Sequence, residues 1–313
     1  MREESAGGGI KRLLLVLGMV VFNSGVFAST YDQLPQIKLN PSKQLGSLPD
    51  KRLREISGMV SSPLHPEWIW ALNDGGNSSR VFRLTRSGEI TGVIKLPDIK
   101  NIDWEDLTAV VVDGTSYLII ADIGDNWGAR ESVRLIVIAE PDLPVSRKPV
   151  LTKATAIIDF KYEDGARDAE SLAVDIDAKK ILVLSKRDSP AGLYELPLQL
   201  DASLKPLIAK KIGSLTGIPQ PGLSELTEHW SLFMSQPTAM DIRGNRMLVL
   251  TYKYAYLYER KPKQTWRDVV AGSPALLRIG RLDQQESVAW LPVENSFLYS
   301  SEGISSPLIH VSW

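Results

Sequence analysis

The sequence predicts an all-β protein, a five-bladed β-propeller, on the strength of three observations. A short motif recurs five times along the chain, and a β-rich run follows each copy at a nearly constant distance. No stretch after residue 30 shows a sustained helical period. Further segments rich in β-branched and aromatic residues bring the repeats to four strands each, which is typical of a propeller blade.

The recurring motif begins with Glu or Gln and carries a small residue three positions later. Its leading residues are Glu55, Glu105, Glu170, Gln236 and Glu286, at spacings of 50, 65, 66 and 50. The β-rich runs that follow are 68–74, 117–122, 181–186, 247–252 and 297–302. Because these runs are almost continuously apolar, we expect both of their faces to be buried between neighbouring blades.

The fifth repeat reaches residue 313 after only three strands. We therefore expect a strand from residues 34–50, either 36–39 or 44–48, to complete that blade and close the ring. Such a closure leaves no free sheet edge at the seam. A six-bladed ring, with extra strands from residues 213–230, is the alternative, but the glycines and prolines of that stretch favour a loop.

The N-terminus has the pattern of a secretory signal peptide over residues 1–28. Lys11 and Arg12 precede an apolar run, and Val26-Phe27-Ala28 resembles a cleavage site. We expect one propeller domain over residues 29–313, a periplasmic or secreted location, and no membrane span after cleavage.

Composition excludes several function classes. Removing residues 1–28 leaves 33 basic and 35 acidic residues, a balance that argues against nucleic acid as a partner. The chain has no cysteine and three scattered histidines, so thiolate chemistry and histidine-rich zinc sites are not expected. We expect a monomer that recognises a small anionic ligand or an envelope protein.

The leading residues of the motif are the candidate metal ligands. In a propeller the first strand of each blade lines the central tunnel, so the five side chains should meet at one mouth. Converging carboxylates repel one another unless a cation is present, and an all-oxygen ligand set suits calcium. Alternatively, each side chain accepts hydrogen bonds from the backbone of the next blade and simply holds the ring together.

Polar residues after the second strands surround this expected mouth. Asp122 and Asp125 are candidate bases, and Lys186 and Arg187 are candidate anion-binding residues. Trp127, in a loop longer than a turn requires, is the best candidate for a surface contact.

Four segments, 73–76, 103–107, 122–126 and 168–172, resemble a family of secreted bacterial propellers similar to phytase-like and SdiA-regulated propellers. The motif also resembles the blades of five-bladed calcium-activated nucleotidases, in which Glu and Ser residues hold a central calcium. These resemblances imply calcium and phosphoester chemistry.

The sequence thus predicts an exported propeller with a central, calcium-binding site of ligand-binding or unassigned activity. The alternative is a calcium-dependent phosphoester hydrolase of phytase-like or nucleotidase-like type. A lactonase-like activity would call for a histidine base, and the histidines are poorly placed for that role.

Mass spectrometry of the protein isolated from its native host should find a mature N-terminus at or near Ser29. Signal peptidase would cut after the small residue Ala28. An intact Met1 or Arg2 terminus would contradict the export prediction.

Overall fold

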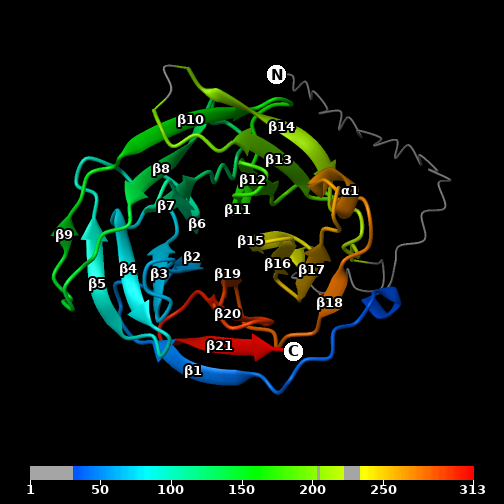
Figure 1. Ribbon diagram of the computed structural model, residues 1–313, viewed down its shortest axis with the longest axis horizontal. Helices are drawn as coiled ribbons and strands as arrows, with labels where there is room; N and C mark the ends of the chain where they lie inside the picture. The colour runs from blue at the N-terminus through cyan, green and yellow to red at the C-terminus, as the bar shows by residue number, and fades with distance from the viewer. Residues whose placement is uncertain (1–30, 203–204, 222–232) are drawn as a thin grey trace, which may run out of the picture.

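In the described residues, all strands except the short β9 form five antiparallel units of four, arranged in a ring around a central axis (Figure 1). The computed structural model describes residues 31–202, 205–221 and 233–313. The predicted signal peptide, residues 1–28, lies outside the described residues.

The five units are blades in chain order, each written from its innermost to its outermost strand. Blade 1 is β2 (Ile56–Ser61), β3 (Trp68–Asn73), β4 (Arg80–Thr85) and β5 (Ile90–Lys95). Blade 2 is β6 (Trp104–Val112), β7 (Thr115–Asp122), β8 (Val133–Ala139) and β10 (Ala156–Tyr162). Blade 3 is β11 (Ala169–Asp175), β12 (Lys180–Ser185), β13 (Gly192–Pro197) and β14 (Leu207–Ser214). Blade 4 is β15 (Pro237–Arg243), β16 (Arg246–Thr251), β17 (Ala255–Glu259) and β18 (Ala275–Leu277). Blade 5 is β19 (Gln285–Trp290), β20 (Ser296–Ser301), β21 (Ser306–Ser312) and β1 (Lys43–Leu48).

Each blade buries both of its faces, as the apolar second strands predict. The buried apolar residues fall into five clusters, and each cluster lies between two neighbouring blades. The cluster between blades 1 and 2, for example, packs Trp70 of β3 with Ile120 of β7. Because a β-strand presents alternate residues to opposite faces, a strand packed on both sides must be apolar at nearly every position.

The ring is closed by the N-terminal strand, as expected. β1 pairs antiparallel with β21, from Lys43 opposite His310 to Leu48 opposite Ser306. Of the two predicted closing segments, residues 44–48 are the ones used. Residue Gln36, in the other segment, forms only an isolated bridge to Leu276 in blade 4.

Three details go beyond the repeat pattern. A short helix, α1 (Trp266–Val270), follows Thr265, which forms a capping box with Asp268. The outermost strands β10 and β14 pair in parallel and join blades 2 and 3 into one eight-stranded sheet, and the short β9 (Val150–Leu151) pairs with β5.

The part of the 213–230 segment after β14 that the structure describes, residues 215–221, contains no strand, which agrees with the loop interpretation. Residues 222–230 lie outside the description.

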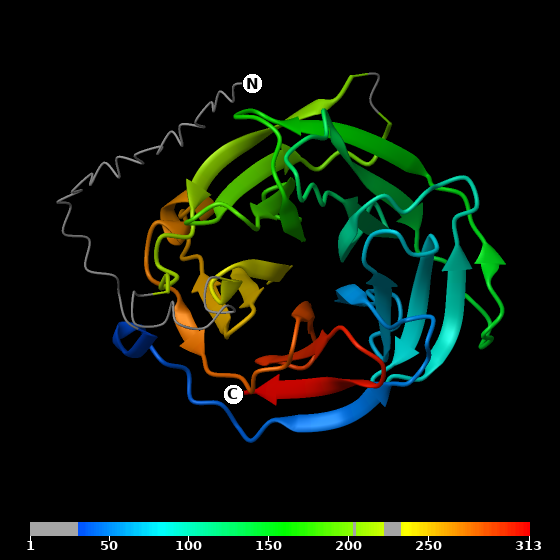
Figure 2. The same ribbon diagram turned by 180° about the vertical axis from the view of Figure 1, so that it is seen from behind.

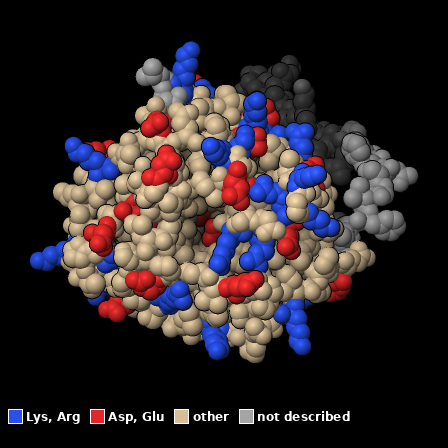
Figure 3. All heavy atoms as spheres, viewed as in Figure 1, with Lys and Arg blue, Asp and Glu red and all other residues tan. Residues whose placement is uncertain are grey.

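In the described residues no helix is long and apolar enough to cross a membrane. Figure 3, in the orientation of Figure 1, shows acidic and basic side chains around a central hollow, with Lys and Arg more frequent on the side of β17 and α1. The charge on this face is therefore mixed rather than uniformly basic.

Replacement of Leu48 by alanine should destabilise the protein by about 3 kcal/mol, because Leu48 of the closing strand is buried between blades 5 and 1. Leu45 lies in the same strand but is 37% exposed, and Leu45→Ala should change stability far less. Urea unfolding of both variants measures the difference. Equal, small effects would show that the seam does not support the ring.

Candidate functional site

Each innermost strand begins with a β-bulge, and the five bulges define one end of the central tunnel, here called the mouth. One residue per blade is left without a partner on the second strand. These residues are Ser57, Glu105, Glu170, Thr238 and Glu286. A bulge re-aims the extra side chain at the rim of a sheet, so the three glutamates occupy equivalent places in blades 2, 3 and 5.

The bulges correct the alignment of the repeats in two blades. The sequence motif treats Glu55 and Gln236 as equivalent to the three glutamates, but the bulge falls two residues later, at Ser57 and Thr238. The small residue three positions after the leading residue is what misaligned them. Glu55 and Gln236 therefore precede β2 and β15 instead of starting within them.

Three carboxylates converge at the mouth. Asp74 follows β3, Asp103 precedes β6, and Glu105 is the bulge residue of β6. Each offers an oxygen atom, and these oxygens all lie within 4.8 Å of one another. Figure 2 shows the same ring of blades from behind.

Two glycines allow this convergence. A Cβ atom at Gly75 would stand 2.2 Å from the Oδ1 atom of Asp103, and one at Gly124 would stand 2.2 Å from the Oε1 atom of Glu105. Any side chain at either position would collide with a carboxylate oxygen. The backbone therefore forms a close-fitting cradle around Asp103.

A second group of polar side chains completes the mouth. Glu170 forms a buried ion pair with Lys186, whose ammonium nitrogen lies 5.3 Å from the centre of the Tyr252 ring. Tyr252 donates its hydroxyl hydrogen to Glu286. Among the described residues, the Oε2 atom of Glu170 is buried and has no hydrogen-bond partner. One lysine thus faces an excess of carboxylates.

Burial and mutual repulsion shift the acid equilibria of these groups. Burial, together with the charge of Glu286, raises the pKa of Asp74 to about 6. Burial, followed by the charges of Glu170 and Asp74, raises the pKa of Glu105 well above its usual value. Burial and the charge of Glu286 raise the pKa of Glu302, at the end of β20, to about 8. A buried carboxylate beside like charges favours its neutral form, and the single Lys186 does not balance the carboxylates of the mouth.

The five residues predicted as metal ligands are divided by the structure. Glu105 belongs to the group of three carboxylates. Glu170 and Glu286 lie in the same ring of bulges but bind Lys186 and Tyr252. Glu55 accepts a hydrogen bond from Asn77 at 2.6 Å, and the buried Oε1 atom of Gln236 has no partner in the described part of the chain.

The four candidate catalytic residues also have assigned partners. Asp122 pairs with Arg130 at 2.9 Å, and the Asp125 carboxylate accepts the backbone N–H groups of Ala129 and Arg130. Lys186 pairs with Glu170, and Arg187 pairs with Asp168 at 2.6 Å. Both basic residues are therefore neutralised by a carboxylate.

Several blade-to-blade ties come from residues other than the motif glutamates. Ser57 donates to the backbone oxygen of Glu105 at 2.6 Å, and Thr238 donates to that of Gln285 at 2.8 Å. The buried Asp106 carboxylate accepts N–H groups from Leu172 and Met240, so it links three innermost strands. Among the described residues, no backbone N–H donates to the side chain of Glu105, Glu170 or Glu286. The backbone bonds that the alternative called for are thus not seen among the described residues, although Glu286 accepts the hydroxyl of Tyr252 in blade 4 and Glu105 accepts the hydroxyl of Ser57 in blade 1 at 3.4 Å.

Sequence reasoning missed Asp103 as a site residue, although a signal was present. The spacing Asp103-Trp104-Glu105 recurs as Asp168-Ala169-Glu170, which places two acids at the entry of two consecutive innermost strands. The Asp168 carboxylate forms an ion pair with Arg187 and accepts a hydrogen bond from the backbone N–H group of Asp125. Asp103 has no such cation directly paired with it among the described residues and joins the carboxylate group.

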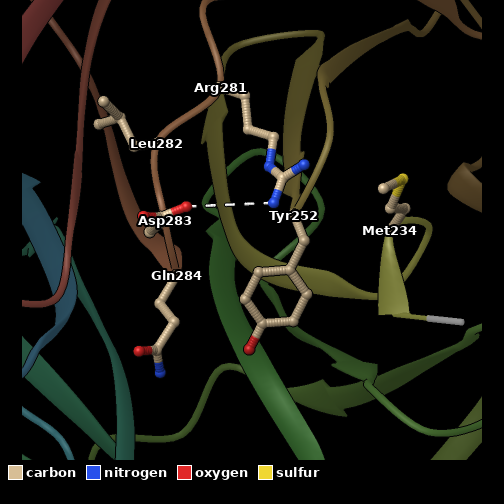
Figure 4. Close-up of a pocket in the computed structure, with 6 residues that line it drawn as sticks. All are labelled: Met234, Tyr252, Arg281, Leu282, Asp283 and Gln284. Carbon is tan, nitrogen blue, oxygen red and sulfur yellow. Dashed lines mark ion pairs between the residues drawn. The ribbon is translucent and has the colours of Figure 1, made fainter. Parts of the chain in front are cut away.

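A pocket of about 270 Å³ adjoins the mouth between blades 4 and 5. Figure 4 shows Tyr252, Gln284 and Met234 around it, with Arg281 facing Asp283 at 4.0 Å. Gln284 also donates a hydrogen bond to Glu302 at 2.9 Å, which connects the pocket to the carboxylates of the mouth. The pocket offers space for a small ligand next to the mouth.

Comparison with known proteins reveals similarity in fold alone. No protein-family model matches the chain, and no curated protein does. Among solved structures, the chain is similar to a PQQ-bound aldose sugar dehydrogenase from Streptomyces coelicolor, with a TM-score of 0.51 and 9% identity over 89% of this chain and 99% of that one. The fold is a β-propeller. A luciferin-regenerating enzyme aligns with a TM-score of 0.44 and 9% identity, over 87% of this chain and 95% of that one.

The resemblance stated above is supported as far as the propeller fold. Its phytase-like part remains a prediction, because a shared propeller does not establish a shared activity.

The free energy of unfolding of chelator-treated protein should fall as the pH rises from about 4 to about 8. Glu302 has a folded-state pKa of about 8, whereas an unfolded glutamate has a pKa of about 4.3, so the folded state retains a proton that the unfolded state has lost. Glu302→Gln should flatten this slope. Urea unfolding at pH 5 and pH 8 measures it, with the exposed Glu294→Gln as control. An unchanged slope in Glu302→Gln would contradict the shifted pKa.

Proposed function

We propose that this protein is a ligand-binding β-propeller whose mouth holds a divalent cation, with Asp74, Asp103 and Glu105 as protein ligands. The observation that carries the proposal is the convergence of three carboxylate oxygens within 4.8 Å of one another. Two oxygens on opposite sides of one calcium ion lie about 4.8 Å apart, twice the usual bond length. The spacing therefore suits a single calcium ion.

The chemistry of the donors supports calcium over other metals. The three ligands are hard oxygen donors, and neither histidine nor cysteine is present in the group. Calcium accepts six to eight oxygens, so three carboxylates would leave positions for water and for oxygen atoms of a bound ligand. The ion would supply the attraction for such a ligand.

The electrostatics of the mouth also favour a cation. Lys186 is ion-paired with Glu170, and its charge offsets the repulsion within the group of three only in part. The Glu170 Oε2 atom is buried without a partner among the described residues. Burial, followed by repulsion from neighbouring carboxylates, raises the pKa values of Asp74 and Glu105, and a bound cation would stabilise their charged forms. Gly75 and Gly124, which leave room for the converging oxygens, fit the same role.

Ligand binding is a better-supported function than phosphoester hydrolysis. A hydrolase of that kind would use Lys186 and Arg187 to hold the phosphoryl group, but Glu170 and Asp168 already neutralise them. The pocket beside the mouth, with Arg281 and the phenol of Tyr252, suits the organic part of a small anionic ligand. We place this function outside the cytoplasm, following the N-terminal pattern of residues 1–28.

Calcium should raise the melting temperature of the chelator-treated protein, because an ion that binds only the folded state stabilises it by mass action. At a free concentration 100 times the dissociation constant the gain is about 2.7 kcal/mol. Calorimetric titration with calcium measures the affinity, and thermal melting measures the gain in stability. Absence of both heat and stabilisation would remove the cation from the proposal.

Asp103→Asn should weaken calcium binding at least about tenfold while leaving the chelated protein as stable as before or more so, because it removes a repelled charge and preserves shape. Glu170→Gln should reduce the stabilisation by calcium less than Asp103→Asn does, because Glu170 lies beside the group of three carboxylates and is not part of it. Asp142→Asn, whose side chain is 84% exposed, is the matched control and should bind normally. Equal affinity in Asp103→Asn and Asp142→Asn would show that the group of three does not hold the ion.

A further inference from the structure

The loop between β7 and β8 presents an isolated tryptophan to solvent. Trp127 is 92% exposed, the most exposed of the large apolar side chains that the structure describes. Its neighbours in the loop, Asn126, Gly128 and Ala129, are exposed and are polar or small. An indole kept in water in this way is unfavourable unless it has a binding role, and tryptophan is enriched at binding hot spots.

The loop is held rigidly despite its exposure. The buried Asp125 carboxylate accepts the N–H groups of Ala129 and Arg130, both at 2.9 Å, and the Asp125 N–H donates to Asp168 at 2.9 Å. Arg130 closes the base of the loop by donating to the Gly124 oxygen at 2.7 Å. Trp127 is therefore presented by a pre-ordered backbone, so little freedom would be lost when it binds.

A pocket of about 210 Å³ lies at the base of the same loop, between blade 2 and the segment that leads from it to blade 3. Its lining includes Asp125, Arg130 and Glu131 from the loop, together with Tyr162 of β10. Tyr162 is 94% buried, and its hydroxyl has no hydrogen-bond partner in the described part of the chain. A buried hydroxyl left unpaired costs free energy, which a ligand with an accepting oxygen would recover.

We propose that Trp127 and this pocket form a saccharide-binding site, independent of the cation at the mouth. A pyranose ring has one face of C–H groups, which packs on an aromatic ring, and an edge of hydroxyls that both donate and accept hydrogen bonds. The indole supplies the first surface. The pocket supplies donors from Arg130 and Tyr162 and acceptors from Asp125 and Glu131. The pocket volume is below the range of about 300–1,000 Å³ for drug-sized ligands, so it fits one small sugar ring. The rest of the saccharide would extend to Trp127.

The surroundings of Trp127 favour a saccharide over a protein partner. The core of a protein interface is depleted in charged residues and gathers several apolar side chains. Here one aromatic residue projects from a loop whose other exposed members are polar or small, above a pocket with two carboxylates and two guanidinium groups. Arg167 is the second of these, and it stacks 5.6 Å from the centre of the Tyr162 ring.

An array of immobilised mono- to tetrasaccharides, probed with the mature protein, tests the proposal directly. Calorimetric titrations with maltotriose and tri-N-acetylchitotriose, which represent glucans and amino-sugar glycans, measure affinity in solution. We expect binding to members of one glycan class, unchanged by a calcium chelator. Trp127→Ala should weaken it at least tenfold and Tyr162→Phe about fivefold.

Matched variants separate binding from folding. Val145 is an exposed apolar residue of another loop, at 76%, and Val145→Ala should bind normally. Tyr258 also has a buried hydroxyl without a partner but lines no pocket among those described, so Tyr258→Phe should bind normally as well. Thermal melting should find Trp127→Ala and Tyr162→Phe as stable as the parent.

Three results would overturn the proposal: no saccharide on the array binds, binding survives Trp127→Ala unchanged, or Trp127→Ala abolishes binding of a protein instead. Since the cation site shares none of these residues, loss of calcium binding in Asp103→Asn with saccharide binding intact would reject neither proposal. The two sites can therefore fail separately.

Discussion

The packing of blade against blade is the constraint on which the rest of this structure depends. Five apolar clusters, one between each pair of neighbouring blades, account for nearly all of the buried core. The second strand of each blade packs on both faces, and its charged residues, where it has any, lie at the strand ends. Functional residues in this fold are thus confined to the two ends of the tunnel and to the loops.

The bulge at the start of each innermost strand turns this confinement into a site. In blades 2, 3 and 5 the bulged residue is glutamate, and in blades 1 and 4 it is Ser57 or Thr238, which ties its blade to the next one. The same structural position therefore serves two purposes. Ser57 and Thr238 tie neighbouring blades by hydroxyl-to-backbone bonds, whereas the glutamates supply charge to the mouth. Burial raises the pKa of Glu105 and of Glu170 in consequence.

The fold could be predicted from the sequence because strand identity depends on local composition, which repeats. The second strands, the loop before blade 4 and the closing strand at residues 44–48 all follow from apolar runs and turn residues. The site could be predicted only in part. Glu55 and Gln236 match the motif by letter, but the residues that align with the three glutamates in the structure are Ser57 and Thr238, two positions later. The recurring small residue misaligned these two blades. Asp103 joins the site through the backbone approach at Gly75 and Gly124, which depends on two loops folding together.

The seam between β1 and β21 makes the order of synthesis matter. β1 is made before the other strands of the propeller, yet its partner β21 follows all of them in the sequence. Lys43, for example, pairs with His310. Blades 1 to 4 can each form from neighbouring segments as they emerge, whereas blade 5 must wait until β21 is available to pair with β1. Until then one face of blade 1, with Leu84 and Val93, has nothing to pack against. Before β1 and β21 pair, the blades therefore form an open arc with an exposed apolar face, and the pairing closes that arc into a ring.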